Sequence, residues 1–166
     1  MEVSLLPEQK TIDSAYSIAL EMAHESPCTR RQYGAVIFLS EGAGVTVGCN
    51  ERVSKCCNDG CLRDAFGIQH AEATDVGGEI HAEQVVLIKN GMRKIDQFIV
   101  LAGIKKGKEL IEADDYPCYS CARIIKFAGF PTVYINRAEG VCPVSIEAIL
   151  EYYEECWKGR LEIGVS

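Results

Sequence analysis

Two short stretches of the chain carry residue types that bind metal ions and move protons. Residues 81–84 read His-Ala-Glu-Gln, and residues 116–121 read Tyr-Pro-Cys-Tyr-Ser-Cys. His81, Cys118 and Cys121 offer one imidazole nitrogen and two thiolates, which are ligands that zinc prefers. Three protein ligands with a fourth position left for water are typical of a catalytic zinc site rather than a structural one. The pattern therefore predicts a catalytic zinc ion held by these three side chains.

The spacing of these residues fits predicted helices that would bring them together. Cys118 and Cys121 are three residues apart in the first turn of a helix, which places both thiols on one face. The positive end of a helix favours the thiolate form that zinc requires. His81 begins another predicted helix, so two helix N-termini would meet at the ion. Glu83 is displaced around that helix, which makes it a poor fourth ligand but lets it exchange protons with a water beside the metal.

Each part of the pattern has a plainer interpretation when it is taken alone. A Cys-x-x-Cys pair also occurs in redox and structural metal sites, a histidine at a helix start often caps the helix, and a helical glutamate is usually solvated. Here Pro117 stands in the first turn before the cysteine pair, and each motif begins a predicted helix. The combination favours the catalytic interpretation, with Glu83 as general acid and base.

Length and composition limit the fold and the partners. The chain has 166 residues, 48% of them hydrophobic, which is enough for one domain with one core, expected to span residues 1–166. No apolar run approaches the ~20 residues of a membrane span, and residues 1–7 are too short and too acidic for a secretory signal. Without such a signal, nine cysteines favour metal binding in a reducing cytoplasm over disulfides. A net charge of −7 and the lack of a basic, aromatic-rich stripe argue against nucleic acid as a partner.

The order of predicted elements indicates an α/β fold. Apolar residues at helical spacing, β-branched runs and turn residues define the elements. In chain order they are a helix over residues 7–24, strands over 34–39 and 45–49, a helix over 81–88, a strand over 98–102, a helix over 118–128, a strand over 132–135 and a helix that Ser145 caps. Residues 50–80 lose this periodicity, and a short helix near 62–66 would fit within them. The alternation predicts a three-layer α/β/α domain with a central mixed sheet.

The chain resembles the cytidine and deoxycytidylate deaminase superfamily over residues 16–137, and it is most similar to the dCMP deaminase branch. Besides the two motifs above, the similarity is carried by Ser-Pro-Cys-Thr-Arg-Arg-Gln-Tyr-Gly-Ala-Val-Ile at 26–37, Gly-Cys-Asn at 48–50, Ala-Gly at 128–129 and Val-Tyr at 133–134. The resemblance implies a cytidine deaminase-like fold. It also implies that Asn50 bonds the sugar, that Ala82 faces the base through its backbone, and that Tyr134 lies near the pocket.

The implied reaction is the zinc-dependent hydrolysis of dCMP to dUMP and ammonia, with a small-molecule nucleotide as the partner. The chain departs from the branch at Glu51, where a glycine is usual, at Asp114, where a threonine is usual, and at Val85-Val86, where Asn-Ala is usual. The alternative substrates are therefore dCTP, free deoxycytidine or cytidine, guanine and a modified pyrimidine. An inactive zinc-stabilised binding module is a further alternative, although such a module would have no use for Glu83.

Further residues could bind a second ion or a phosphate. Some members of the branch carry a structural zinc, and the residues available for one here are Cys28, His70 and one of Cys56, Cys57 or Cys61. A phosphate-binding cation could come from Arg30, Arg31, Arg52, Lys55 or Arg63. The plainer interpretation is that these cysteines are small packing residues and that the charges are solvated. Because deaminases of this fold generally associate, the resemblance also implies a homo-oligomer.

Overall fold

The computed structural model describes residues 6–40, 44–53, 61–68, 78–91, 93, 96–105 and 116–163. The elements along these segments are α1 (Gln9–Glu25), β1 (Arg31–Leu39), β2 (Thr46–Cys49), β3 (Glu51–Arg52), α2 (Leu62–Ala65), β4 (Glu79–Ile80), α3 (Ala82–Asn90), β5 (Gln97–Lys105), α4 (Tyr119–Phe127), β6 (Thr132–Arg137), β7 (Gly140–Ser145) and α5 (Ile146–Ile163). None of these helices is long and apolar enough to cross a membrane.

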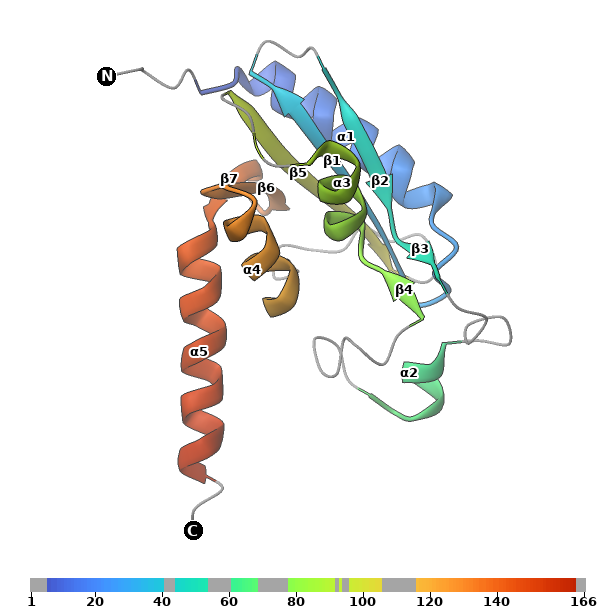
Figure 1. Ribbon diagram of the computed structural model, residues 1–166, viewed down its shortest axis with the longest axis vertical. Helices are drawn as coiled ribbons and strands as arrows, with labels where there is room; N and C mark the ends of the chain where they lie inside the picture. Colours follow the sequence, from blue (N-terminus) through green and yellow to red (C-terminus); the bar gives the residue numbers. More distant parts are fainter. Residues whose placement is uncertain are drawn as a thin grey trace.

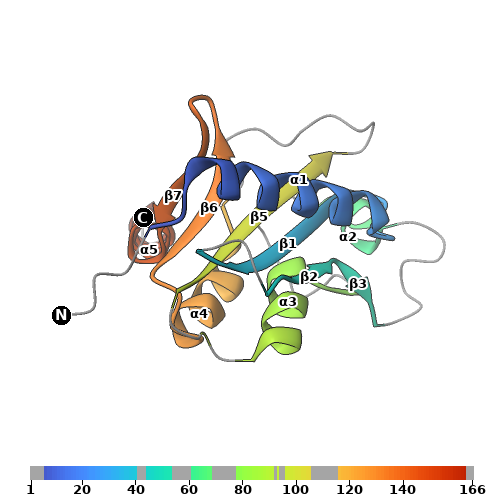
Figure 2. The ribbon, with the colours of Figure 1, turned by 90° about the horizontal axis from the view of Figure 1, so that it is seen from above.

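A mixed five-stranded sheet forms the centre, with the strand order β2-β1-β5-β6-β7. β1 pairs antiparallel with both β2 and β5, β5 runs parallel to β6, and β6 pairs antiparallel with β7. α1 covers one face of the sheet, and α3 and α4 lie on the other face (Figures 1 and 2). The predicted α/β fold with three layers and a mixed sheet is therefore confirmed.

Each face of the sheet carries its own buried cluster. Small side chains of α1, among them Ala15 and Ala19, pack against Val36, Phe38 and Val100. Gly34 permits this contact, because a Cβ at this position would overlap the Ala19 carbonyl oxygen. The helix therefore lies directly on the backbone of β1, and it anchors the strand at the end where the pocket residues begin.

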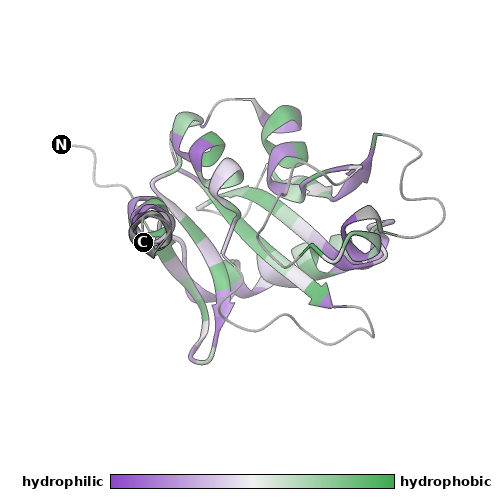
Figure 3. Ribbon diagram, turned by 90° about the horizontal axis from the view of Figure 1, so that it is seen from below, coloured by the Kyte–Doolittle hydropathy of each residue, from purple (hydrophilic) through white to green (hydrophobic). Residues whose placement is uncertain are grey.

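The opposite face holds the larger cluster, in which residues of α3, α4 and α5 pack on β1, β5 and β6. β5 is buried along all of its length except Lys105, which confirms the prediction of a strand covered on both faces. The central strands are largely hydrophobic along their length in Figure 3. Since α3 and α4 share this face, their N-termini are held over the same region of the sheet.

The structure adds two features that the sequence analysis did not predict. The first is β7, an edge strand of alternating exposure that contains Pro143, a residue that an edge position tolerates because its missing N–H is not needed there. The second is a two-stranded ribbon of β3 and β4, in which Glu51 pairs with Ile80. Within residues 50–80 the expected short helix is present as α2. At the start of α5, Ser145 Oγ accepts a bond of 3.5 Å from the N–H of Ala148, as expected for a helix cap.

Candidate metal centre and active site

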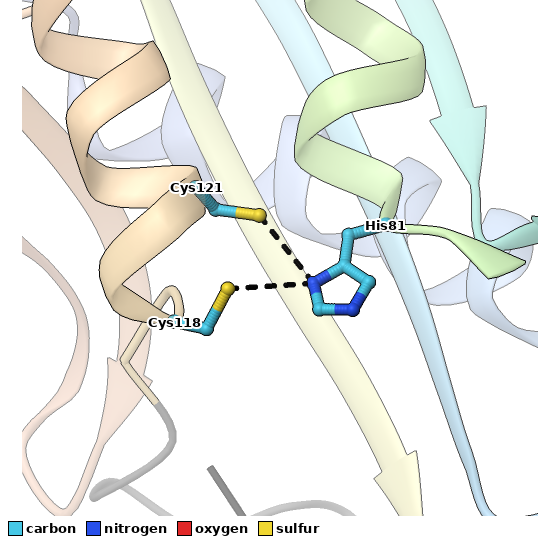
Figure 4. Close-up of side chains that lie close together, drawn as sticks. All are labelled: His81, Cys118 and Cys121. Carbon is cyan, nitrogen blue, oxygen red and sulfur yellow. Dashed lines mark hydrogen bonds between the residues drawn. The ribbon is translucent and has the colours of Figure 1, made fainter. Parts of the chain in front are cut away.

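Two helix starts bring three metal-binding side chains together. His81 is the residue before α3, and Cys118 is the residue before α4. The His81 Nδ1 atom lies 3.5 Å from Cys118 Sγ and 3.4 Å from Cys121 Sγ, and Figure 4 shows the imidazole facing both thiols. The Gln84 side chain accepts a bond of 3.2 Å from the His81 backbone N–H, which fixes the first turn of α3. Within the described part of the chain, this cluster alone gathers three metal-binding groups.

The spacing of these atoms fits a zinc ion. Zinc binds thiolate sulfur at about 2.3 Å and imidazole nitrogen at about 2.0–2.1 Å, so tetrahedral ligands place N and S about 3.6 Å apart. The distances of 3.4 and 3.5 Å from His81 Nδ1 to the two sulfurs match this separation. His81, Cys118 and Cys121 can therefore hold one zinc ion without moving far.

The three ligand side chains also shift one another's pKa values. A hydrogen bond from Cys121 and the contact with His81 lower the pKa of Cys118 to about 4. The same contact with Cys118 is the largest cause that raises the pKa of His81 to about 9. The pKa of Cys121 is raised well above its usual range, first by its bond to Cys118 and then by burial. At neutral pH the protein without metal therefore carries one thiolate, one imidazolium and one thiol here.

Zinc uptake is expected to release about two protons per ion at both pH 5.5 and pH 7.5, because a metal ligand must lose its proton. Cys118 is already ionised at both values, whereas His81 and Cys121 are protonated at both. Ligands with ordinary pKa values would release about three protons at pH 5.5, since imidazole is then mostly charged. Calorimetry in buffers of different ionisation enthalpy measures the number, and a rise toward three at pH 5.5 would contradict this account.

Glu83 is the carboxyl group beside this cluster. The residue is only 6% exposed although it is acidic, and it lines the same pocket as His81 and Cys118. Burial is the main cause that raises the pKa of its carboxyl group, while the charge of His81 and a hydrogen bond with Cys121 lower it in part. A raised pKa brings the carboxyl group closer to the pH at which an enzyme works, which is the property that a general acid and base needs.

The remaining predicted substrate-binding residues do not all reach this pocket. Asn50 lines it, and its Oδ1 accepts a bond of 2.6 Å from the N–H of Tyr33. Ala82 is fully buried between two lining residues, and its side chain packs in the core. Tyr134 is not brought to the pocket: it packs with Phe98 in the cluster under α1. The prediction that Tyr134 lies near the pocket therefore does not fit its position.

The residues expected to bind a second metal ion are only partly described. Cys57 and His70, like Cys56, lie outside the described residues. Cys28 and Cys61 both line the pocket. The thiol of Cys28 donates to Glu79 at 3.2 Å, and burial is the main cause that raises its pKa to about 11. In this arrangement Cys28 is a neutral thiol.

The pocket also contains residues that the sequence analysis did not connect with the site. They are Tyr33, Glu79, Leu101, Tyr116 and Tyr153. Tyr116 is two residues before Cys118, and Tyr33 lies within the segment at 26–37, so both were near recognised motifs. Tyr153 belongs to the last helix, and its place in an apolar stripe indicated packing alone. Of the five cations considered for phosphate binding, the pocket is lined by Arg30, Arg31 and Arg63. Lys55 lies outside the described residues.

The chain matches a known family in sequence and resembles solved structures in fold. The family described as "cytidine and deoxycytidylate deaminase zinc-binding region" matches residues 9–137, whereas no curated protein matches the sequence. The crystal structure of dCMP deaminase from cyanophage S-TIM5 in apo form is similar at a TM-score of 0.52 and 19% identity, covering 78% of this chain and 85% of that one.

The same cyanophage enzyme in complex with dCMP and dUMP gives a TM-score of 0.50 at 20% identity, with 78% and 83% of the two chains covered. Cytidine deaminase from Mycobacterium tuberculosis gives 0.48 at 19% identity, with 83% and 92% covered. At these identities the structural similarity concerns the fold. With more than half of its length matched by the family, this chain belongs to the cytidine and deoxycytidylate deaminase family.

Proposed function

We propose that this protein is a zinc-dependent hydrolase that deaminates a cytosine nucleotide, with dCMP as the favoured substrate and dUMP and ammonia as products. The observation that supports the proposal most is the shared pocket of His81, Cys118 and Glu83. A structural metal site needs no buried carboxyl group beside it. Burying a carboxyl group costs free energy, and a role in proton transfer is a reason for the protein to keep one at this place.

In the proposed reaction, the oxygen of water bonds to C4 of the cytosine ring and the C4–N4 bond breaks. Glu83 accepts one proton from the attacking water and delivers it to N3 of the ring. It then passes the second proton of that water to the leaving amino group, so that ammonia departs and uracil remains. A zinc ion held by His81, Cys118 and Cys121 supplies a Lewis acid that lowers the pKa of a water ligand toward ~7. The raised pKa of Glu83 suits both directions of this transfer.

The amide of Asn50 is the proposed contact to the sugar. Its Oδ1 is engaged by the Tyr33 N–H, and its own N–H bonds to the Tyr33 carbonyl at 3.1 Å. The Ser26 hydroxyl donates to the Asn50 carbonyl at 3.3 Å. These bonds fix the orientation of the side chain, so the Nδ2 group is available as a donor toward a sugar hydroxyl. The backbone of Ala82, between two lining residues, is the proposed contact to the base.

Arginine side chains support a substrate that carries a phosphate. The Nη2 atom of Arg30 donates to the Ile68 carbonyl at 2.8 Å, and its Nε atom lies 3.2 Å from Asp64 Oδ1. Its Nη1 atom is buried and has no hydrogen-bond acceptor among the described residues. After burial, the charge of Arg30 is the next cause that lowers the pKa of Arg63. Two nearby positive charges in a chain of net charge −7 favour an anion in this part of the pocket.

The zinc-loaded protein is expected to release ammonia from dCMP in preference to deoxycytidine, cytidine, dCTP and guanine. In Arg30→Gln, kcat/KM for dCMP should fall about tenfold or more, since a charge-assisted hydrogen bond contributes about 1.5–3 kcal/mol, whereas kcat/KM for deoxycytidine should change little. The measurement is the rate of ammonia release for each compound.

Lys126→Gln is the matched control for this experiment. It also removes one positive charge, but Lys126 is an exposed partner of Glu147 at 2.8 Å and does not line the pocket. Its kinetics should resemble those of the wild type. Turnover of deoxycytidine in preference to dCMP would exclude the nucleotide substrate. If zinc-loaded protein turns over none of these compounds, the proposed deaminase activity is excluded.

Three expectations stay predictions: a homo-oligomer, a second zinc ion and a cytoplasmic location. A measured molar mass in solution tests the first, a metal count per chain tests the second, and fractionation of the source cells tests the third.

A further inference from the structure

Aromatic side chains gather where the start of α4 meets α5. The cluster consists of Tyr116, Tyr119, Tyr152, Tyr153 and Trp157. α4 and α5 lie side by side in both Figure 1 and Figure 2, and the second half of α5 continues beyond α4. The buried residues Ile146, Ile149 and Leu150 fix the start of α5 to the core, and Tyr119 and Tyr153 pack against the same core as partly buried side chains.

Tyr153 is the residue of α5 that lines the catalytic pocket, together with His81, Glu83 and Cys118. It is partly buried, while the other residues between 151 and 158 are exposed. The site thus has an aromatic wall contributed by an element that carries none of the family motifs. A flat aromatic ring at the edge of a pocket is suited to contact a planar heterocycle, which gains about 1–3 kcal/mol from stacking on such a ring.

The ring of Tyr153 is held in place by its neighbour Tyr119. Their centroids are 6.0 Å apart at an interplanar angle of 69°, which is a favourable edge-to-face arrangement. Tyr119 directly follows the metal-binding residue Cys118, and its ring also contacts Trp157 at 4.4 Å and 67°. The position of the Tyr153 ring is therefore coupled to the start of α4 and so to the metal cluster.

A platform for stacking nucleic acid bases is the other use of such a cluster, and the charges oppose it. The exposed face of α5 carries Glu147, Glu151, Glu154 and Glu155, which would repel the phosphates of a strand. The stacking partner is instead a small molecule that enters the pocket.

We propose that Tyr153 stacks on the heterocyclic ring of the substrate and so contributes to binding from the C-terminal helix. The proposal rests on the proposed function, because it assigns the pocket a pyrimidine ligand. A stacking residue requires an aromatic ring at position 153 but not the hydroxyl group. Stacking that is equal in the substrate and the transition state lowers KM and leaves kcat unchanged.

The test compares Tyr153→Phe and Tyr153→Leu in zinc-loaded protein with dCMP as the substrate. Tyr153→Phe keeps the ring and loses only the hydroxyl group, so its KM should rise by less than about threefold if stacking is the main contribution of this residue. Tyr153→Leu keeps apolar volume without a ring, so KM should rise about tenfold while kcat changes less than about threefold, as expected for the loss of roughly 1.4 kcal/mol of uniform binding.

Tyr152→Leu is the matched control on the same helix. Tyr152 contacts Tyr153 at 5.5 Å, but it is half exposed, and it lines a surface hollow with Tyr116 and Val144 rather than the catalytic pocket. Its KM should change less than about twofold. Equal rises of KM in both leucine variants would show a packing effect and would overturn the proposal, as would an unchanged KM in Tyr153→Leu.

Binding without turnover separates this inference from the proposed function. Trp157 is the only tryptophan of the chain, and it reaches Tyr153 through Tyr119. Titration with dUMP should therefore change the tryptophan fluorescence, with about tenfold weaker binding in Tyr153→Leu. If the wild type binds dUMP and this variant binds equally well, the stacking role alone is wrong. If the wild type binds no pyrimidine nucleotide, both the function and this inference are wrong.

Discussion

Glu83→Gln is expected to lower kcat for dCMP by about a thousandfold, because positioned proton transfer contributes about 10²–10⁴ to a rate. The amide has nearly the same shape as the carboxyl group but cannot accept the proton of the attacking water. Glu83 does not belong to the cluster of metal-binding atoms, so the variant should still bind one zinc ion per chain. The measurements are single-turnover kinetics and the metal content of the purified protein.

Glu79→Gln is the matched control for this effect. Glu79 also carries a carboxyl group that lines the pocket, and it is only two residues before His81. It is half-buried rather than buried, and it accepts a hydrogen bond from Cys28. Its replacement should change kcat by less than about tenfold, which is below the roughly 10²–10⁴ that a positioned proton-transfer group contributes. Activity of Glu83→Gln at the level of the wild type would remove Glu83 from the mechanism, even with zinc in place.

The metal cluster could be predicted from the sequence because its geometry is mostly local. Cys118 and Cys121 share a face of α4 through their spacing alone, and His81 stands at the start of a helix that its own sequence predicts. The one long-range contact is between the two helix starts, and the pairing of β1 with β5 under them provides it. The fold class could also be predicted from local patterns, because predicted helices alternate with strands that are apolar on both sides.

Contacts that depend on the register of a strand could not be predicted. Successive side chains of a strand point to opposite faces. In β6, Val133 and Ile135 face α3 and α4, and Tyr134 between them therefore faces α1. A Val-Tyr sequence alone does not predict which of its two side chains lies on the face of the sheet that carries the site. β7 was missed for a related reason, since the exposed alternation around Pro143 resembles a loop until β6 is seen beside it.

The cationic and aromatic walls of the pocket could not be assembled from the sequence either. Arg30 and Arg63 come from the segment before β1 and from α2, which the periodicity does not connect. Tyr153 comes from α5, where its spacing from Ile149 and Leu150 indicates an ordinary core stripe. Its contact with the pocket depends on how α5 lies against the start of α4, and no local pattern in the sequence encodes that placement.

Cys121→Ser is expected to weaken zinc binding by at least about a hundredfold. Even the loss of a group that only orients a metal ligand costs about 10–100-fold in affinity, and Cys121 is a ligand candidate itself. Its side chain is fully buried, so no water can enter to replace the sulfur without disturbing the core. A serine hydroxyl at this place stays protonated and is a poor ligand for zinc, which prefers thiolate here.

The loss should also appear as a loss of metal-dependent stability. Zinc at about a thousand times its dissociation constant stabilises the folded protein by about 4 kcal/mol, which corresponds to roughly 8–16 °C in Tm for a chain of this size. Removing zinc with a chelator should lower the Tm of the wild type by this amount and leave the Tm of Cys121→Ser unchanged. Cys142→Ser is the matched control, because Cys142 lies on β7 with its thiol 3.9 Å from Glu139, outside the cluster. It should respond to the chelator as the wild type does. A Cys121→Ser protein that retains one tightly bound zinc ion would show that the ligands have been assigned wrongly, because two of the three side chains cannot hold the ion that strongly on their own.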